Sequence, residues 1–271
     1  MSSKQGVFQE LAALLADVQR HFPHWSQREV VTQIRRSMAE YNQGVWELAL
    51  PLNRGESSLI KDYRERFAEL RRRAIIEERL DLGHVFTSID VKQNVDVIRD
   101  AYASWAGDLG THVLANYSRQ TQSSVGEADS PAGLEDLHGD IDGDNIGRHM
   151  PKGEAIRAIL AYYLGDETLM NGVTVGSRYQ IFARDLGLID RDGHFNIDRE
   201  QVRFALHNRT REFIALDEIN LDAHEPLKLL KDLFDTHEHD QVEILLDAAL
   251  EQFLSLIAAG VERERNPLSN A

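Results

Sequence analysis

The sequence predicts a mainly α protein, a multi-helix domain with one small β-hairpin near residues 188–198. Apolar residues recur at helical spacing through most of the chain, and helix start and stop signals bound these stretches. The alternation typical of strands is confined to the hairpin, where Asp192-Gly193 stands between apolar residues. With 271 residues and 42% hydrophobic content, the chain can bury a substantial core.

The N-terminal part predicts three helices. They are expected over residues 8–22, 26–44 and 60–73. Pro23 stops the first, and the second opens on a capping box formed by Ser26 and Glu29. The third ends in the basic run Arg71 to Arg73, which we expect to face solvent or the acidic remainder of the protein.

The middle of the chain is less regular. Residues 81–93, which begin DLGHVFTSID, interrupt the helical pattern, and a long helix is expected over 97–117. Residues 121–133 are polar and rich in Ser and Gly, as is typical of a linker. Ser130-Pro131 is then a helix start with proline at the first position.

The C-terminal part continues with short elements. A helix over 156–163 is expected to end at Gly165, and Asn171-Gly172 predicts a tight turn. Helices are further expected over 177–187, 224–236 and 240–262. The predicted organisation is a main helical domain, residues 1–175, with a C-terminal helical subdomain, residues 176–271.

The stretch HGDIDGDNIGRHM, residues 138–150, is the strongest candidate for a functional site. On a helix, His138, Asp142, Asn145 and His149 share one face, with Asp140 and Asp144 on the far side. Gly139, Gly143 and Gly147 form a neighbouring stripe that lets another backbone approach. A carboxylate between histidines could hold a divalent metal or orient a general base, while a solvated face would produce the same stripe. The candidate metal ligands are Asp140, Asp142, Asp144 and His149, for Ca²⁺, Mg²⁺ or Zn²⁺.

The same stretch can also be interpreted as a loop. Asp140, Asp142 and Asp144 then stand at positions 1, 3 and 5 of a calcium loop, but positions 6 and 12 are Asn145 and Pro151, where Gly and an acid are usual. A second partial match, formed by Asp190, Asp192 and Asp198, departs from the pattern in the same way. Helix and loop remain open alternatives.

Two companion stretches combine the same residue types. DLGHVFTSID contains His84, and WAGDLGTHV contains Asp108 and His112. We expect the three regions to meet at a shared cleft, with His84, Asp108, His138 and Asp142 as its inner, catalytic residues. The alternative is that each is an ordinary half-buried histidine or surface acid.

The amino-acid composition limits the classes of function that this chain can have. A net charge of −15 disfavours nucleic acid and anionic membranes and favours a basic partner. The chain has no cysteine, which excludes disulfides and thiolate chemistry, and it lacks the common nucleotide, zinc-protease and serine-hydrolase motifs. No stretch is apolar enough for a membrane span, and no Sec-type signal is evident. We therefore expect synthesis in the cytoplasm.

The blocks DLGHVF, WAGDLG and GDIDGDNIG resemble those of bacterial secreted effectors and polymorphic-toxin domains, over residues 80–150. The resemblance implies export without a Sec signal and attack on an envelope polymer such as peptidoglycan. The first hypothesis is therefore a hydrolase in which Asp142 is the principal acid, base or metal ligand. The alternative is a non-enzymatic acidic adaptor or immunity-type protein that binds a basic protein partner.

Overall fold

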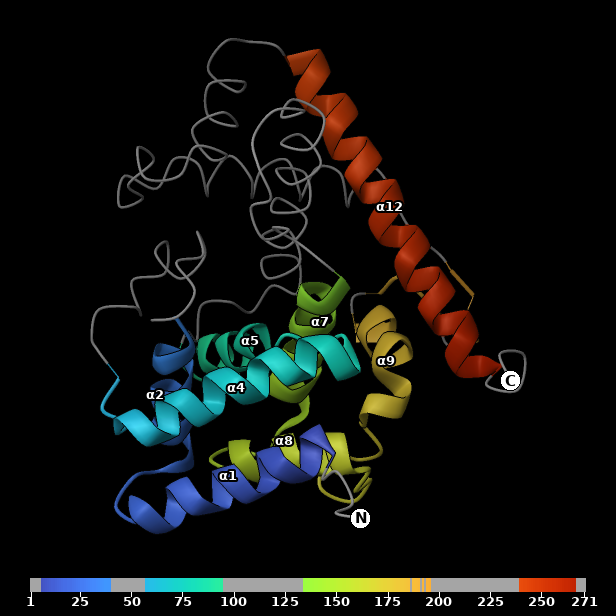
Figure 1. Cartoon of the computed structure of the whole chain (residues 1–271). Helices are drawn as coiled ribbons and strands as arrows, with labels where there is room; N and C mark the ends of the chain where they lie inside the picture. Colours follow the sequence, from blue (N-terminus) through green and yellow to red (C-terminus); the bar gives the residue numbers. More distant parts are fainter. Residues whose placement is uncertain are drawn as a thin grey trace, which may run out of the picture. The chain divides into compact units, whose positions relative to one another are not determined.

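The computed structural model describes residues 6–39, 57–94, 134–185, 187–190, 192, 194–195 and 239–266. The mainly α fold is confirmed, because this part of the chain contains eight α-helices and no β-sheet (Figure 1). The helices are α1 (Val7–His21), α2 (Gln27–Ala39), α4 (Lys61–Glu78), α5 (Leu82–Asn94), α7 (Leu134–His149), α8 (Ala155–Leu164), α9 (Arg178–Asp185) and α12 (His239–Arg265). The helix expected over 97–117, the linker 121–133 and the helix 224–236 lie outside the described residues.

The chain divides into two compact units. One unit comprises residues 1–97 with 134–182, and the other comprises residues 98–133 with 183–271. The first unit contains α1, α2, α4, α5, α7, α8 and most of α9, and these helices carry His84, His138, Asp140 and Asp142. In the second unit the described part consists mainly of α12, whose Leu254, Ile257 and Val261 are buried. Within the described residues, no helix is long and apolar enough to cross a membrane.

The predicted N-terminal helices are confirmed, with starts within one residue of those expected. α4 continues five residues past Arg73, to Glu78, and the end expected at Gly44 lies outside the described residues. α1 ends just before Pro23, which cannot continue a helix. At the start of α2 the capping box is reciprocal. The N–H of Ser26 donates to the Glu29 carboxylate over 2.6 Å, and the N–H of Glu29 donates to the Ser26 hydroxyl over 3.2 Å.

The break expected over residues 81–93 is wrong, because most of this stretch forms α5. Leu82, Val85, Phe86 and Ile89 recur at helical spacing and are completely buried. Asp81 caps the helix, since its carboxylate accepts the N–H of Gly83 over 2.7 Å. Burial of this apolar stripe therefore outweighs the weak helix propensity of the polar and glycine residues between its members.

Of the two expected positions for Arg71, facing solvent or facing the acidic remainder of the protein, the first is wrong and the second is met in the interior. Its guanidinium is buried and pairs with the Asp81 carboxylate. Arg72 is exposed, as expected, and Arg73 pairs with Glu77 and Glu10 at the surface. One arginine of this basic run therefore belongs to the interior, because a buried carboxylate requires a partner.

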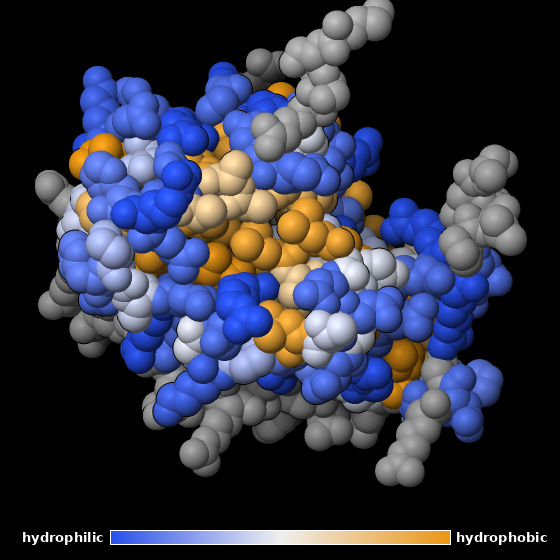
Figure 2. Space-filling model, turned by 90° about the horizontal axis from the view of Figure 1, so that it is seen from below, coloured by the Kyte–Doolittle hydropathy of each residue, from blue (hydrophilic) through white to orange (hydrophobic). Residues whose placement is uncertain are grey.

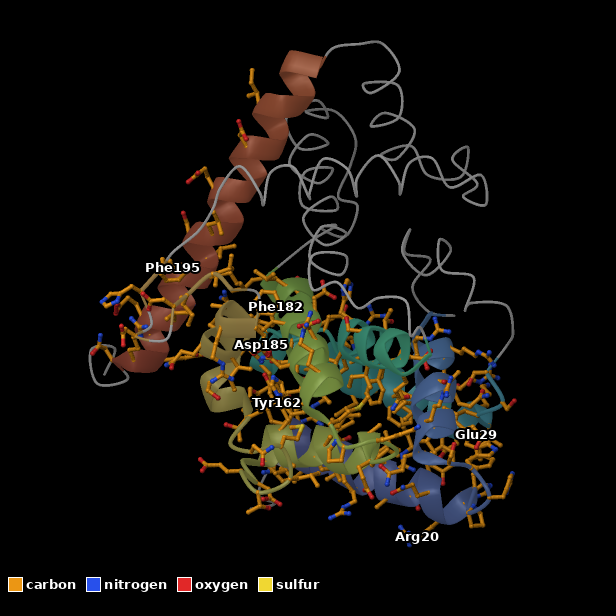
Figure 3. The ribbon with its side chains drawn as sticks, turned by 180° about the vertical axis from the view of Figure 1, so that it is seen from behind. Arg20, Glu29, Tyr162, Phe182, Asp185 and Phe195 are labelled. Carbon is orange, nitrogen blue, oxygen red and sulfur yellow. The ribbon has the colours of Figure 1, made fainter. Side chains whose placement is uncertain are left out.

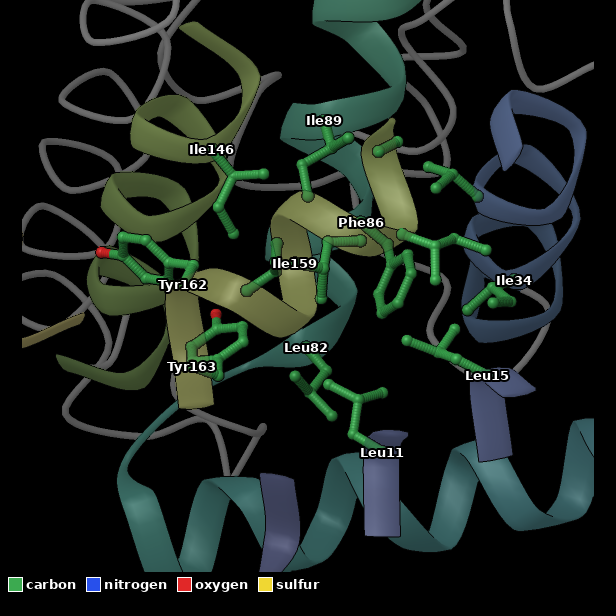
Figure 4. Close-up of a cluster of buried hydrophobic side chains, with 14 of the residues drawn as sticks. Leu11, Leu15, Ile34, Leu82, Phe86, Ile89, Ile146, Ile159, Tyr162 and Tyr163 are labelled. Carbon is green, nitrogen blue, oxygen red and sulfur yellow. The ribbon is translucent and has the colours of Figure 1, made fainter. Parts of the chain in front are cut away.

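A single hydrophobic core occupies the first unit. Side chains from α1, α2, α4, α5, α7 and α8 meet in it, including Leu11, Ile34, Phe86, Ile146 and Tyr162 (Figure 4).

The surface on the side of α1 and α8 is largely polar, with apolar atoms gathered near its middle (Figure 2). Apolar surface of this extent is ordinary for a folded protein and carries no functional assignment.

Most of the helix ends and turns expected around α8 and α9 are confirmed. α8 ends at Gly165 in the left-handed conformation, with φ of 76°, and Asn171 and Gly172 both have positive φ as a tight turn requires. α9 is followed by Gly187, with φ of 70°. Of the predicted hairpin, the described residues contain one antiparallel bridge, between Ile189 and Phe195.

Arg79 provides a test of backbone strain in this unit. It follows α4 in the left-handed conformation, with φ of 49°, which costs a non-glycine residue about 1 kcal/mol. Replacing Arg79 by glycine is expected to raise the free energy of unfolding by about 0.5–1 kcal/mol, measured by chemical denaturation. Arg79→Ala keeps the strained backbone and is the control, so equal stability of the two variants would contradict the prediction.

Candidate functional site

Residues 134–149 form the helix α7, which settles the choice between helix and loop. Residues 140–147 lie inside it and do not form a calcium loop. From Leu137 to Ile146 every residue except Asp140 is buried. Asp144, on the face of α7 opposite Asp142, is therefore also buried. α7 runs through the interior as an unusually polar helix.

The glycine stripe serves the close approach of α5 to α7. A Cβ atom at Gly139 would lie 2.5 Å from the carbonyl oxygen of Asp81 and 2.7 Å from the Cβ of His84. At Gly143 it would lie 2.6 Å from the Cβ of Ser88 and 2.8 Å from the carbonyl oxygen of Val85. All four separations are too short for real atoms. The expectation that these glycines admit another backbone is therefore confirmed.

Asp142 lies at the centre of a closed hydrogen-bond network. Its carboxylate, which has no exposed surface, accepts bonds of 2.5 and 2.6 Å from the Arg178 guanidinium. It also accepts bonds from the hydroxyls of Tyr162, over 2.6 Å, and Tyr163, over 3.0 Å. Figure 3 shows Tyr162 inside the unit, and Figure 4 shows Tyr162 and Tyr163 among the buried side chains of the core. The side chain points inward as expected, toward an arginine and two phenols.

Burial and the neighbouring charges keep the two tyrosine hydroxyls and the Arg178 guanidinium protonated. Burial raises the pKa of Tyr162 and Tyr163 well above its usual value, and the adjacent Asp142 charge raises it further. Burial works against the charge of Arg178, but the neighbouring carboxylate raises its pKa. Asn145 supports the network by donating to the Tyr162 hydroxyl and the Arg178 carbonyl, over 3.3 and 3.0 Å. The two phenols and the guanidinium therefore keep their protons near neutral pH.

His138 also makes interior contacts. Its Nδ1 lies 2.7 Å from the carbonyl oxygen of Arg79, and its Nε2 lies 2.6 Å from the hydroxyl of Tyr179. A carbonyl oxygen only accepts, so Nδ1 carries a proton, and in the neutral ring Nε2 accepts from the tyrosine. The imidazole thus links the end of α4 to α9.

His84 and Asp140 form a partly accessible histidine–carboxylate pair between the two stretches that the structure describes. His84 Nδ1 lies 2.9 Å from Asp140 Oδ1, and the two side chains are 29% and 12% exposed. His84 stands in the first turn of α5, and Asp140 stands on α7. The structure therefore brings two of the three expected stretches together, but on a different side of α7 from Asp142. Asp108, in the third stretch, lies outside the described residues.

The four expected metal ligands do not converge within the described part of the chain. Asp140 pairs with His84, Asp142 with Arg178, and Asp144 with Arg148 over 2.5 Å. His149 is half-buried near the end of α7. The one three-ligand group among the described residues is the exposed trio Asp190, Asp192 and His194, whose ligand atoms lie within 4.8 Å of one another. Exposed acids often gather in this way without a metal.

Sequence reasoning missed the arginines that hold these carboxylates. Three Asp side chains in the interior each pair with an arginine from another part of the chain. The pairs are Arg35 with Asp90, Arg71 with Asp81, and Arg178 with Asp142. No local spacing links the members, since they lie 10 to 55 residues apart. The only available signal was that aspartates on apolar helices need positive partners.

The chain belongs to the family described as YkzU uncharacterised protein, whose model matches residues 73–264. The match begins within α4 and includes α5, α7, α8 and α9, and it therefore covers the candidate site. Comparison with curated proteins and with solved structures found no match.

Proposed function

We propose that this chain is a hydrolase whose general base is His84, oriented by Asp140. The observation that carries the proposal is the 2.9 Å contact between His84 Nδ1 and the Asp140 carboxylate in a pair that is partly open to solvent. A carboxylate bound to Nδ1 fixes the tautomer of a catalytic histidine and stabilises the imidazolium that forms during reaction.

The other imidazole and carboxylate that we considered fit this role less well. The Asp142 carboxylate accepts four hydrogen bonds and has no surface through which a substrate could reach it. Both nitrogens of His138 contact protein groups. We assign Asp142 and His138 to the scaffold that supports α7.

The pair can catalyse hydrolysis of an acyl bond. Since Asp140 holds the proton on Nδ1, the lone pair of the neutral ring lies on Nε2, on the opposite side of the imidazole. Nε2 takes a proton from a water molecule as its oxygen adds to the carbonyl carbon of the substrate. The imidazolium then returns this proton to the leaving group as the carbon–heteroatom bond breaks. General base catalysis of this kind contributes about 100- to 10,000-fold.

The substrate class comes from the resemblance to secreted effectors. That resemblance favours an envelope polymer, and a water-activating histidine fits the amide bonds of peptidoglycan peptides. The polymer is therefore proposed as the substrate with His84 as the single reacting side chain.

The test is hydrolysis of dye-labelled peptidoglycan by the purified full chain. We expect His84→Gln to lower kcat/KM by about 100-fold or more with an unchanged melting curve. Asp140→Asn should lower kcat while leaving KM nearly unchanged. His194→Gln changes an exposed histidine and serves as the matched control. Full activity of folded His84→Gln would eliminate the proposed base.

A second candidate function rests on the distribution of charge. Residues 212–251 contain twelve acidic and two basic residues, and so hold most of the net charge of −15. This concentration favours an acidic adaptor or immunity-type protein that binds a basic partner. In that case affinity for the partner falls as salt is added, and His84→Gln leaves the binding unchanged.

A further inference from the structure

We infer that Asp142, Tyr162, Tyr163 and Asn145 form a binding site for an arginine residue of a basic protein partner, and that Arg178 of the same chain occupies this site in the structure. The inference is independent of the proposed hydrolase, because it involves neither the proposed base nor the carboxylate that orients it. A basic partner is also the class of partner that a net charge of −15 favours.

The helices α7 and α8 prepare the Asp142 carboxylate for a guanidinium. The hydroxyl of Tyr162 donates to Oδ1 over 2.6 Å, and the hydroxyl of Tyr163 donates to Oδ2 over 3.0 Å. Each carboxylate oxygen accepts one further bond, from Nε or Nη2 of Arg178, over 2.5 and 2.6 Å. Two parallel donors in one plane match a carboxylate, whereas an ammonium group has no such pair. The site therefore favours an arginine side chain over a lysine.

The amide of Asn145 extends the site to the backbone of the bound arginine. Its Nδ2 donates to the carbonyl oxygen of Arg178 over 3.0 Å and to the Tyr162 hydroxyl over 3.3 Å. The Tyr162 proton points to Asp142, so both contacts of Nδ2 are with acceptors, which fixes the orientation of the amide. Asn145 is completely buried, and its Oδ1 accepts no hydrogen bond within the described part of the chain. A buried acceptor without a donor is rare and calls for a partner.

The helical backbone of Arg178 explains why this oxygen is unpaired. Arg178 begins α9 with φ of −44° and ψ of −57°, and its N–H donates to the carbonyl oxygen of Val175 in the preceding turn. In an extended residue the N–H and the C=O point to the same side, so one planar amide can pair with both. An arginine in an extended segment of a partner therefore satisfies both ends of the Asn145 amide, whereas Arg178 satisfies one.

The helix α9 is the element that a partner must displace. It is eight residues long, it follows the short turn Val175–Ser177, and the first unit ends within it, at Phe182. A partner arginine replaces the two bonds from Arg178 to Asp142 with two bonds of the same kind. The affinity for the partner is lowered by the fraction of molecules in which α9 stays docked. While Arg178 fills the site, Asp142 serves the scaffold.

The experiment measures the binding of capped arginine, N-acetyl-arginine-N′-methylamide, to the purified full chain by calorimetry. Arg178→Ala removes the competing side chain, and we expect about tenfold or more tighter binding than in the wild type. The citrulline analogue has the same shape without the charge and should bind about tenfold weaker. Ethylguanidinium lacks the backbone groups and should also bind about tenfold weaker, which distinguishes an arginine residue from a free alkylguanidinium.

Three further variants serve as controls. Arg184→Ala removes an arginine of the same helix whose side chain is 59% exposed, and it should bind capped arginine as the wild type does. Asn145→Leu, introduced into Arg178→Ala, should lower the affinity for capped arginine to that for ethylguanidinium. Arg178→Lys keeps a cation beside the buried carboxylate, and one ammonium group pairs with it less well than the guanidinium. Capped arginine should therefore bind this variant more tightly than the wild type.

The position of the ligand supplies the second readout. In the wild type, saturation with capped arginine should shift the Nε–H NMR resonance of Arg178, because this side chain leaves Asp142. Equal affinities for capped arginine and its citrulline analogue in folded Arg178→Ala, or in Arg178→Lys if the first variant does not fold, overturn the inference. Binding to the wild type with an unchanged Arg178 resonance also overturns it. His84→Gln should bind capped arginine normally, so its activity bears on the proposed function alone.

Discussion

Replacing Asp142 by asparagine is expected to lower the free energy of unfolding by about 3–5 kcal/mol. The wild-type carboxylate is completely buried and accepts four hydrogen bonds, two of them from Arg178. Asparagine removes the charge that compensates Arg178 and places an N–H₂ group where a donor already points. A buried cation without its partner costs more than the lost hydrogen bonds alone.

Urea denaturation followed by circular dichroism measures this effect, and two variants provide controls. Asp62→Asn changes an aspartate that is 71% exposed and pairs weakly with Arg66, so stability should hardly change. Asp142→Leu combined with Arg178→Met removes both charges, and its cost should be well below the sum of the two single substitutions. An Asp142→Asn variant as stable as the wild type would refute a buried ion pair at this position.

Gly143→Ala is expected to lower the free energy of unfolding by about 2–3 kcal/mol. The added methyl group would overlap with the Cβ of Ser88 and the carbonyl oxygen of Val85. Backbone atoms cannot rotate away as a flexible side chain can. The helices α5 and α7 must therefore separate, which weakens packing along their whole contact. This loss opposes the gain of about 1 kcal/mol that alanine normally brings to a helix interior.

Gly176→Ala is the matched control for this substitution. A Cβ atom at Gly176 would meet only the Thr174 hydroxyl, at 3.6 Å, and its backbone is not in the left-handed region. Chemical denaturation should therefore show almost no change for Gly176→Ala. If Gly143→Ala were equally harmless, the close approach of α5 and α7 would not exist in solution.

These two predictions separate the scaffold from the proposed chemistry. Asp142 and Gly143 are neighbours in the stretch that first suggested a catalytic site, yet the contacts of both explain stability. Substitutions at His84 are expected to act on catalysis with little effect on unfolding. The combination of a stability scan and an activity scan over α5 and α7 therefore tests the assignment of roles directly.

Local signals were sufficient for much of the fold. Pro23 and the Ser26–Glu29 capping box predict the junction of α1 and α2, and Gly165 predicts the end of α8, because these residues act on the backbone next to them. The prediction for the α5 stretch is wrong because its glycine and polar residues disfavour a helix locally, whereas burial of its apolar stripe stabilises one. The glycines of α7 correctly indicated a close approach, without indicating which helix approaches.

The sequence by itself therefore determined the mainly α fold and several helix ends, and it marked Asp142 as a candidate for an inward-facing carboxylate. Only the tertiary structure decided that Asp142 meets Arg178 and that Asp140 meets His84. The physical reason is range. Caps, turns and apolar stripes depend on residues within one or two helical turns. The role of a carboxylate depends on whichever side chain the packed helices bring within about 3 Å, and in this chain Arg178 and His84 come from 36 and 56 residues away.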